Sequence, residues 1–328
     1  MVGIALALGA SLCWGSGDFL GGLSTRRASL WAVIIGSQAV GLTGAALVTL
    51  LAGHGWPGLH AVWPVLLGGF ASVVAISSFY KALAIGTMSI VAPISAANAA
   101  IPFLAGIAAG ERPTGLQLAG VALAAAGVLL VAMERARDDE RVGVAALPGE
   151  PAVEPATARS LFAGRAGRDP APPTATGAPA PGPRRAPQPT RGAQRRAIGL
   201  ALLAAVCMGL VLIGYDATAR YDPLWAMLGG RLSSALVFSL VFLTLRPRIR
   251  VTRSAIPFIV AVGLLDTGAN GLFALATTQG YLSIVSVLGS LYPVVTVLLA
   301  FAVLRERIAP HQLAGAAATL AGIALIAA

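Results

Sequence analysis

The second half of this chain repeats the first. Glu111-Arg112 followed by Gln117-Leu118-Ala119-Gly120 recurs as Glu306-Arg307 followed by Gln312-Leu313-Ala314-Gly315. Nine of the sixteen positions that start at Gln117 are identical to those that start at Gln312, and Gly86-x-x-Ser89-Ile90-Val91 pairs with Gly280-x-x-Ser283-Ile284-Val285. A repeat of this kind predicts two copies of one structural unit.

The composition places both copies in a membrane. Of 328 residues, 57% are hydrophobic and 11% are charged, whereas a soluble domain has roughly 25% charged residues. Ten apolar stretches approach the ~20 residues that a helix needs to cross a bilayer. The predicted spans are 3–21, 30–52, 62–85, 88–109, 114–133, 197–217, 223–245, 255–278, 282–303 and 309–327. We therefore expect an all-α membrane protein with ten transmembrane helices, arranged as two inverted five-helix repeats.

Residues 134–196 separate the two repeats, which cover residues 1–133 and 197–328. The segment holds 11 of the 21 prolines and 11 arginines. A chain of this composition cannot bury enough apolar surface to offset its ordering entropy, so we expect a disordered linker. A regulatory or lipid-binding tail is the alternative.

Five helices per repeat, an odd number, make the second copy enter the membrane from the opposite side. Inverted repeats are common in secondary transporters, whose binding sites lie near the bilayer midplane between the halves. The loops on one side carry most of the arginines: Arg26, Arg27, Arg135, Arg137, Arg195, Arg196, Arg246, Arg248, Arg250, Arg253, Arg305 and Arg307. The opposite side carries Arg112 and Arg220. The positive-inside rule then predicts a cytoplasmic linker and termini outside the cytoplasm, and it accounts for the net charge of +10 without nucleic acid.

Three motifs resemble the EamA-type transporters of the drug/metabolite transporter superfamily: Trp14-Gly15, Phe79-Tyr80-Lys81-Ala82-Leu83, and Glu111 followed by Gln117-x-x-Gly120. The resemblance covers both halves but not the linker. It implies a ten-helix carrier that exports metabolites, amino acids or drugs by alternating access, often with proton coupling. The chain departs from the pattern at Met208-Gly209, where the second copy lacks Trp-Gly, and at Asn98, which stands where the second copy has Pro293. Members usually have cytoplasmic termini, which disagrees with the arginine distribution.

Five ionisable residues fall within the spans: Asp18, Lys81, Asp216, Arg231 and Asp266. A charge at the centre of a membrane helix costs about 2.5 to 3.5 kcal/mol on insertion scales, so such residues usually face a cavity or a partner. Asp266 lies near mid-bilayer with Asn270 one turn away. It suits a proton carrier or the counter-ion of a cationic substrate, and the alternative is a structural ion pair with Arg231.

Arg231 stands between Gly229-Gly230 and Ser233-Ser234, where small neighbours would let a ligand approach. A guanidinium can hold a carboxylate but cannot relay protons. Pairing with Asp266 or Asp216 is the equal alternative for this residue.

Asp18 and Asp216 occupy nearly matching positions in the two copies, so inversion would place them near opposite faces. We interpret them as gate candidates that pair with Arg26 or Arg220 in one state only; carboxylates that reach the headgroup layer are the alternative. Tyr80 and Lys81, which end the third span, are further gate candidates. A lysine in that place can also simply snorkel to the interface.

The remaining candidates for the substrate or proton pathway are Trp14, Asn98, Ser290 and Tyr292. Trp14 shares a helix face with Asp18 and could form an aromatic cavity wall. Interior prolines interrupt two of the predicted spans. Asn98 lies with Ser95 near Pro102, and Ser290 and Tyr292 lie beside Pro293. An interrupted helix is tolerated at membrane depth where the chain meets protein or water. Ordinary core packing is the alternative for all four.

Two further features of the repeat have structural interpretations. We expect Glu111 and Glu306 to cap the helices that they precede. The glycines Gly120, Gly127, Gly315 and Gly322 indicate close helix contact, either between the repeats or between protomers.

We therefore predict a secondary-active transporter of small metabolites or drugs that works by alternating access, with export as the favoured direction. A facilitative channel or a structural membrane scaffold is the alternative. The sequence contains no enzyme motif, and we expect no cofactor and no metal. The expected partners are a small-molecule substrate and the lipid bilayer, with protons as candidate coupling ions, in a plasma-membrane protein that is a monomer or homodimer.

Overall fold

A computed structural model describes residues 1–25, 27–85, 91, 94, 97–142, 191–304 and 310–327. In the first half these form α1 (Val2–Thr25), α2 (Leu30–Leu51), α3 (Leu59–Ile85), the short 3-10 helix η1 (Ala97–Ala99), α5 (Ala100–Ala108) and α6 (Gly115–Val142). The second half contains α8 (Arg191–Ala219), α9 (Pro223–Leu245), the 3-10 helix η2 (Arg253–Ala255), α10 (Ile256–Gln279), α11 (Leu282–Gly289), α12 (Tyr292–Leu304) and α13 (Pro310–Ala327).

The helices have the length and composition of a membrane bundle. Among the described residues, seven segments are long and apolar enough to cross a bilayer, and three shorter apolar helices accompany them. Large apolar side chains point outward; Leu236, Leu240 and Leu243 on successive turns of α9 are 60 to 69% exposed. Such a surface is stable against acyl chains, where a helix satisfies its backbone hydrogen bonds internally. The prediction of an all-α membrane protein is confirmed.

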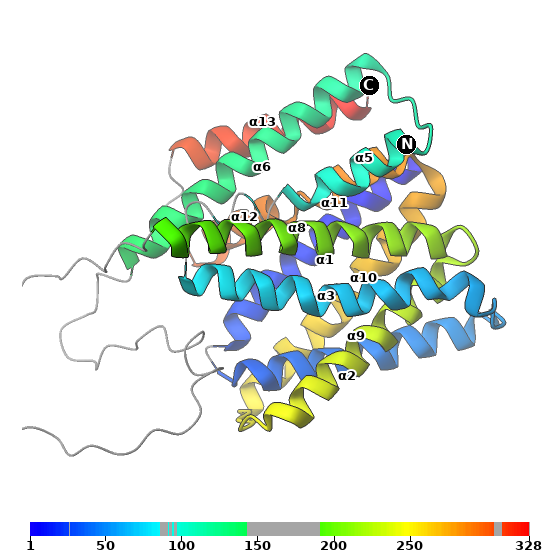
Figure 1. Ribbon diagram of the computed structural model, residues 1–328, viewed down its shortest axis with the longest axis vertical. Coiled ribbons are helices and arrows are strands. Elements are labelled where there is room, and N and C mark those ends of the chain that lie inside the picture. The colour runs from blue at the N-terminus through cyan, green and yellow to red at the C-terminus, as the bar shows by residue number, and fades with distance from the viewer. Residues whose placement is uncertain are drawn as a thin grey trace, which may run out of the picture.

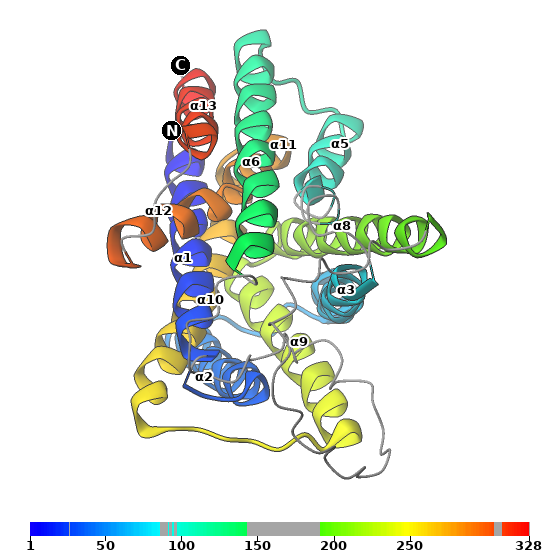
Figure 2. The same ribbon diagram turned by 90° about the vertical axis from the view of Figure 1, so that its left-hand side faces the viewer.

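The two halves of the chain are interleaved. α1 packs along α10 and α3 along α8, so each of these pairs joins a helix of the first half to one of the second. The same is true of α6 with α13 and of α2 with α9, which lie at opposite edges of the molecule in Figures 1 and 2. Most of the core is therefore built between the halves.

Glycines set the contact between α6 and α13. A Cβ placed on Gly120 would lie 2.7 Å from the carbonyl oxygen of Gly322, and one on Gly127 would lie 2.5 Å from that of Gly315. The order of these contacts makes the two helices antiparallel. Small residues allow backbones to approach this closely, so the predicted close helix contact is one between the two halves of a single chain.

The span predicted for residues 282–303 is not one helix. α11 ends at Gly289 and α12 begins at Tyr292. Pro293 has no N–H with which to bind the carbonyl of Gly289 four residues earlier, so a regular helix cannot continue through this point. In the first half, η1 precedes α5 in the span 88–109, and the residues between 86 and 96 lie outside the described part except Val91 and Ile94.

Both ends of the predicted linker are helical. α6 continues to Val142 and α8 starts at Arg191, so both helices extend beyond the boundaries of the predicted spans. The acidic and basic residues that follow Met133 are compatible with a helix, and no glycine or proline interrupts it before Gly143. Residues 143–190 lie outside the described residues.

Glu111 caps a different helix from the one expected. Its Oε1 and Oε2 accept hydrogen bonds from the backbone N–H groups of Leu282 and Ser283 at the start of α11, at 2.7 and 2.9 Å. α6, which follows Glu111, instead has a capping box between Thr114 and Gln117. The equivalent Glu306 lies outside the described residues.

The chain ends and the arginine-rich loops lie at opposite ends of the bundle. The termini are close together in both views (Figures 1 and 2), whereas α1 and α9 run from that end to the loops that carry Arg27 and Arg250. These two loops are joined by a bridge between Ala28 and Val251 and by the hydrogen bond from Ser29 N to Arg250 O, 2.8 Å long. Arg26 lies outside the described residues.

Candidate functional site

A cavity of about 320 Å³ lies in the middle of the bundle. Its walls come from α1, α2, α3, η1, α8, α9 and α10 and from the break between α11 and α12. All seven residues expected on the substrate or proton pathway line it: Trp14, Asn98, Arg231, Asp266, Asn270, Ser290 and Tyr292. The structure therefore brings together, from both halves, side chains that are up to 278 positions apart in the sequence.

An ion pair forms one wall of the cavity. Nη2 of Arg231 on α9 donates to Oδ2 of Asp266 on α10. The structure therefore contains the Arg231–Asp266 ion pair that was the alternative interpretation of each residue. Nη1 of Arg231 donates to Oε1 of Gln38 on α2, 2.8 Å away. A buried guanidinium needs such partners to offset its desolvation.

The two members of the pair differ in accessibility. The side chain of Asp266 is 42% exposed and that of Arg231 only 4%. Gly41 of α2 lies beside the arginine, and its missing side chain makes room for α10, since a Cβ there would clash with Oγ1 of Thr267. Asn270 is tied to its own helix through a 2.8 Å hydrogen bond to the carbonyl of Asp266.

Trp14 and Tyr292 form an aromatic wall at the helix break. Their ring centroids are 6.4 Å apart in an edge-on arrangement, and Trp14 also lies 5.7 Å from Phe273. The neighbouring Gly15 explains the Trp-Gly motif, because a Cβ there would lie 2.6 Å from the carbonyl oxygen of Tyr292. Thr296 fixes this contact by donating to the carbonyl of Gly15 at 3.1 Å.

Asn98 occupies the equivalent place in the first half. It is buried in η1, and a Cβ on Gly209 of α8 would lie 2.9 Å from its carbonyl oxygen. Gly209 thus contacts Asn98 as Gly15 contacts Tyr292. The spatial counterpart of Asn98 is therefore Tyr292, and the sequence-based match of Asn98 with Pro293 was wrong by one position.

The gate candidates separate into different places. Asp18 lines the central cavity. Lys81 is exposed on α3 and is not among the described residues that line either cavity, and the side chain of Tyr80 lies outside the described part.

Asp216 lines a second cavity of about 410 Å³ nearer the end with the termini. Its Oδ2 accepts from Nη2 of Arg220 at 2.8 Å, which is the expected pairing. His60, Trp63 and Tyr221 stand in the same cavity.

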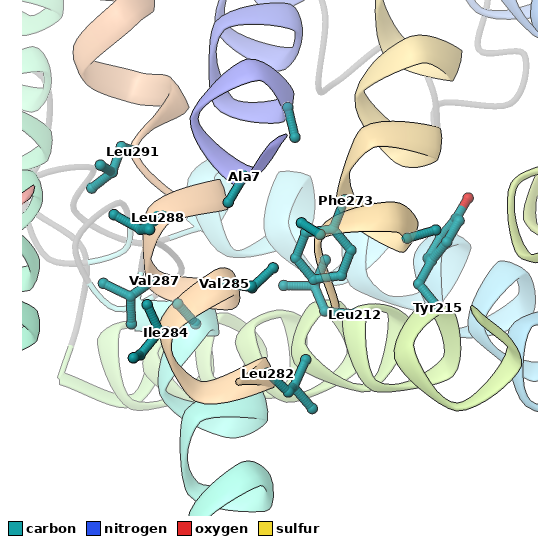
Figure 3. Close-up of a cluster of buried hydrophobic side chains, with 14 of the residues drawn as sticks. Ala7, Leu212, Tyr215, Phe273, Leu282, Ile284, Val285, Val287, Leu288 and Leu291 are labelled. Carbon is teal, nitrogen blue, oxygen red and sulfur yellow. The ribbon is translucent and has the colours of Figure 1, made fainter. Parts of the chain in front are cut away.

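An apolar cluster borders both cavities. Phe273 and Leu288 are fully buried in it, and Figure 3 shows Phe273 of α10 and Leu212 of α8 pointing toward one another. Leu212 also lines the central cavity, whereas Leu282, at another edge of the cluster, lines the second cavity.

Sequence reasoning missed Gln38 and this apolar cluster. Gln38 could have been found as the single amide in the apolar stretch 30–52, where an uncharged polar side chain also needs a partner. The cluster could not have been found, because leucine, valine and phenylalanine are common at every position of such helices.

Comparison with known proteins agrees with these features. The family model of the EamA-like transporter family matches residues 1–133 and 195–328. The chain belongs to this family. It is accordingly a membrane transporter of the drug/metabolite type, as the resemblance predicted, in a family of transporters rather than enzymes.

The comparisons add little beyond the family. No curated protein matches the chain. Among the solved structures, 24 chains match, and one titled "Crystal structure of protein" has a TM-score of 0.68 at 16% identity, covering 98% of this chain and 94% of that chain. At this identity the likeness shows the fold alone.

Proposed function

We propose that this family member is a secondary-active carrier that moves a small solute through the central cavity by alternating access. The observation that carries the proposal is the cavity itself, in which Asp266 and Arg231 lie at membrane depth beside the broken helix of Ser290. A purely structural bundle would not need charged side chains beside a cavity, because a charge within the membrane costs free energy.

The position of the apolar cluster supports one-sided access. The cavity residues Ser234 and Phe238 of α9, and Ser72 and Ile76 of α3, follow one another toward the arginine-rich end of the bundle. Toward the end with the termini, the way is closed by the cluster around Phe273. In the proposed cycle this state is open to the arginine-rich side, and the second cavity is the vestibule of the other side.

Matched contacts support an inverted repeat. Gly15 meets Tyr292 as Gly209 meets Asn98. α6 of the first half and α13 of the second pack antiparallel, so a rotation that exchanges the two halves would superimpose this pair on itself. A two-fold axis in the membrane plane requires such an arrangement. In such a carrier Asp18 and Asp216, one in each half, serve as gate elements on opposite sides.

The arginine-rich loops that carry Arg27, Arg246, Arg248 and Arg250 set the proposed orientation. The positive-inside rule places them, and the linker, in the cytoplasm of a plasma-membrane protein. The cavity then opens to the cytoplasm in this state, which is the state from which an exporter loads its substrate.

Proton coupling is proposed to act at Asp266, because a carboxylate can exchange a proton for a solute whereas Arg231 cannot. Asp266→Asn should abolish uptake driven by a pH gradient, while exchange of solute for solute should persist at solute concentrations high enough to saturate the variant. Uptake at the wild-type rate would assign the coupling to another group.

The carrier proposal is tested by counterflow in proteoliposomes with the full-length protein. Small amines, amino acids and nucleosides are loaded inside, and uptake of the same labelled compound is followed. A carrier saturates and is accelerated by internal substrate. Flux that never saturates would instead establish a channel, and no flux at all, with the protein folded, would favour a scaffold.

A further inference from the structure

The inference concerns the chemical class of the solute and rests on the proposed function of the central cavity. It starts from the unequal exposure of the ion pair. A ligand that enters the cavity meets Asp266, 42% of whose side chain is exposed, while Arg231 is 4% exposed. The accessible charge of the pair is thus negative.

Arg231 lines the cavity, but its guanidinium is held by partners on neighbouring helices. Its Nη1 donates to Gln38 at 2.8 Å and its Nη2 donates to Asp266. Its Nε faces the surface of α2 at Gly41 and makes no hydrogen bond within the described residues. Because the side chain of Arg231 is only 4% exposed, an anion that bound its guanidinium would compete with Asp266 for it, and displacement would leave that carboxylate unpaired at membrane depth.

Asp266 can accept a further partner without this loss. Arg231 engages its Oδ2, and a carboxylate has a second oxygen and further lone pairs with which to accept hydrogen bonds. A ligand ammonium could therefore add to the existing pair. Arg231 would remain in place and orient the carboxylate.

The remaining walls suit the rest of such a ligand. Trp14, Phe238 and Tyr292 line the cavity, and aromatic faces attract cations within about 6 Å while packing against apolar groups. A second carboxylate, Asp18, stands on the same helix as Trp14, one turn further along, and also lines the cavity. The volume of about 320 Å³ is at the lower end of the roughly 300 to 1,000 Å³ of small-molecule sites.

We propose that the cavity binds small organic cations, amines with an aromatic or apolar body, with Asp266 as the counter-ion and Arg231 as a positioning residue. Anions and neutral analogues of the same shape bind more weakly. Zwitterions also bind more weakly, because their carboxylate would lie next to Asp266.

Four compounds of one shape test the charge preference: phenethylamine, 3-phenylpropionate, phenylalanine and 2-phenylethanol. Each is titrated at neutral pH against purified full-length protein, and the midpoint of thermal unfolding is followed, since binding to the folded state raises it. We expect phenethylamine to bind at least tenfold more tightly than the other three. Tightest binding of 3-phenylpropionate or of phenylalanine, or no effect of phenethylamine, would overturn the proposal.

Substitutions assign the charge. Asp266→Asn should weaken phenethylamine binding at least tenfold, while Asp266→Glu should retain most of it. Asp222→Asn, the same chemical change in a loop away from the cavity, should leave it unchanged. Arg231→Gln should preserve or strengthen amine binding, because it removes a competing cation; tenfold weaker binding in this variant would contradict a positioning role.

If Asp266→Asn alone fails to fold, the double variant Asp266→Asn/Arg231→Gln removes both charges and leaves no unpaired ion. Phenethylamine binding at wild-type strength in the double variant would overturn the proposal. Counterflow tests the carrier function independently. Saturable counterflow without a preference for amines would contradict the cation site but not the carrier function. Selective amine binding without counterflow of any amine would contradict the carrier function but not the cation site.

Discussion

Glu111 and Leu282 join the two halves of the chain at a helix end. Oε1 of Glu111 lies 2.7 Å from the backbone nitrogen of Leu282, and Oε2 lies 2.9 Å from that of Ser283. A carboxylate at a helix N-terminus satisfies free N–H groups and interacts favourably with the helix dipole. The glutamate that marks the sequence repeat is therefore a connection between repeats.

Replacing this glutamate should destabilise the fold. Glu111→Ala should cost about 2 to 3 kcal/mol, because two charge-assisted hydrogen bonds to the first turn of α11 are lost. Glu111→Gln keeps one acceptor oxygen and should cost less. Thermal unfolding of the purified variants gives the order wild type, Gln, Ala. Thr114→Ala, which removes the capping box of α6, is a control of similar size on the neighbouring helix, and a Glu111→Ala variant more stable than this control would contradict the assignment.

This contact illustrates what the sequence could and could not disclose. The repeat, the apolar spans and the scarce charges Arg231 and Asp266 predicted the membrane bundle and a set of residues that share one cavity. They did so because a charge in an apolar span has few places to go. Which helix Glu111 caps could not be predicted, since the nearest free N–H groups in the sequence are not the nearest in space.

The helix break at Ser290 was only partly predictable. Pro293 made an interruption plausible, but prolines also kink helices without ending them. What the break contacts depends on Gly15, whose missing Cβ admits the carbonyl of Tyr292. Likewise, Arg231 is held away from solvent by its hydrogen bond to Gln38, which lies on a helix that the sequence identified only as an apolar span.

The α6–α13 contact should not tolerate a side chain at Gly127. A Cβ there would lie 2.5 Å from the carbonyl oxygen of Gly315 and 2.7 Å from the backbone nitrogen of Thr319. Gly127→Ala should therefore cost about 1 to 3 kcal/mol through overpacking. The control is Gly199→Ala on α8, where nothing lies within 4 Å of the added Cβ, and helix propensity should stabilise by up to roughly 1 kcal/mol. Unfolding midpoints that shift in the same direction would contradict this reading of the contact.

Asp222 should stabilise the chain chiefly as a helix cap. Its Oδ1 accepts from the backbone nitrogens of Leu224 and Trp225 at 2.8 and 3.0 Å, and its Oδ2 lies 2.5 Å from Nδ1 of His54. Asp222→Ala should cost about 1 to 2 kcal/mol, whereas Asp222→Asn keeps the cap. His54→Ala should cost less than about 1 kcal/mol, because the histidine is well exposed. The measurement compares the unfolding midpoints of the wild type and the three variants. If His54→Ala lowered the midpoint as much as Asp222→Ala, the His54–Asp222 pair, and not the helix cap, would be the main contribution of Asp222.

The last prediction concerns the apolar cluster as the barrier between the cavities. In a background with Cys13→Ala and Cys207→Ala, a membrane-impermeant thiol reagent should modify Asn270→Cys at least tenfold faster from the arginine-rich side than from the side of the termini. Ala217→Cys, in the second cavity, should show the opposite preference.

Adding Phe273→Ala removes a fully buried ring from this barrier and leaves a cavity that neighbouring side chains fill only partly. It should therefore speed modification of Asn270→Cys from the side of the termini, while its rate from the arginine-rich side changes little. The measurement uses vesicles of both orientations, and Ala217→Cys reports whether the second cavity itself has changed. Equal modification of Asn270→Cys from both sides with Phe273 in place would mean that the cluster is not the barrier.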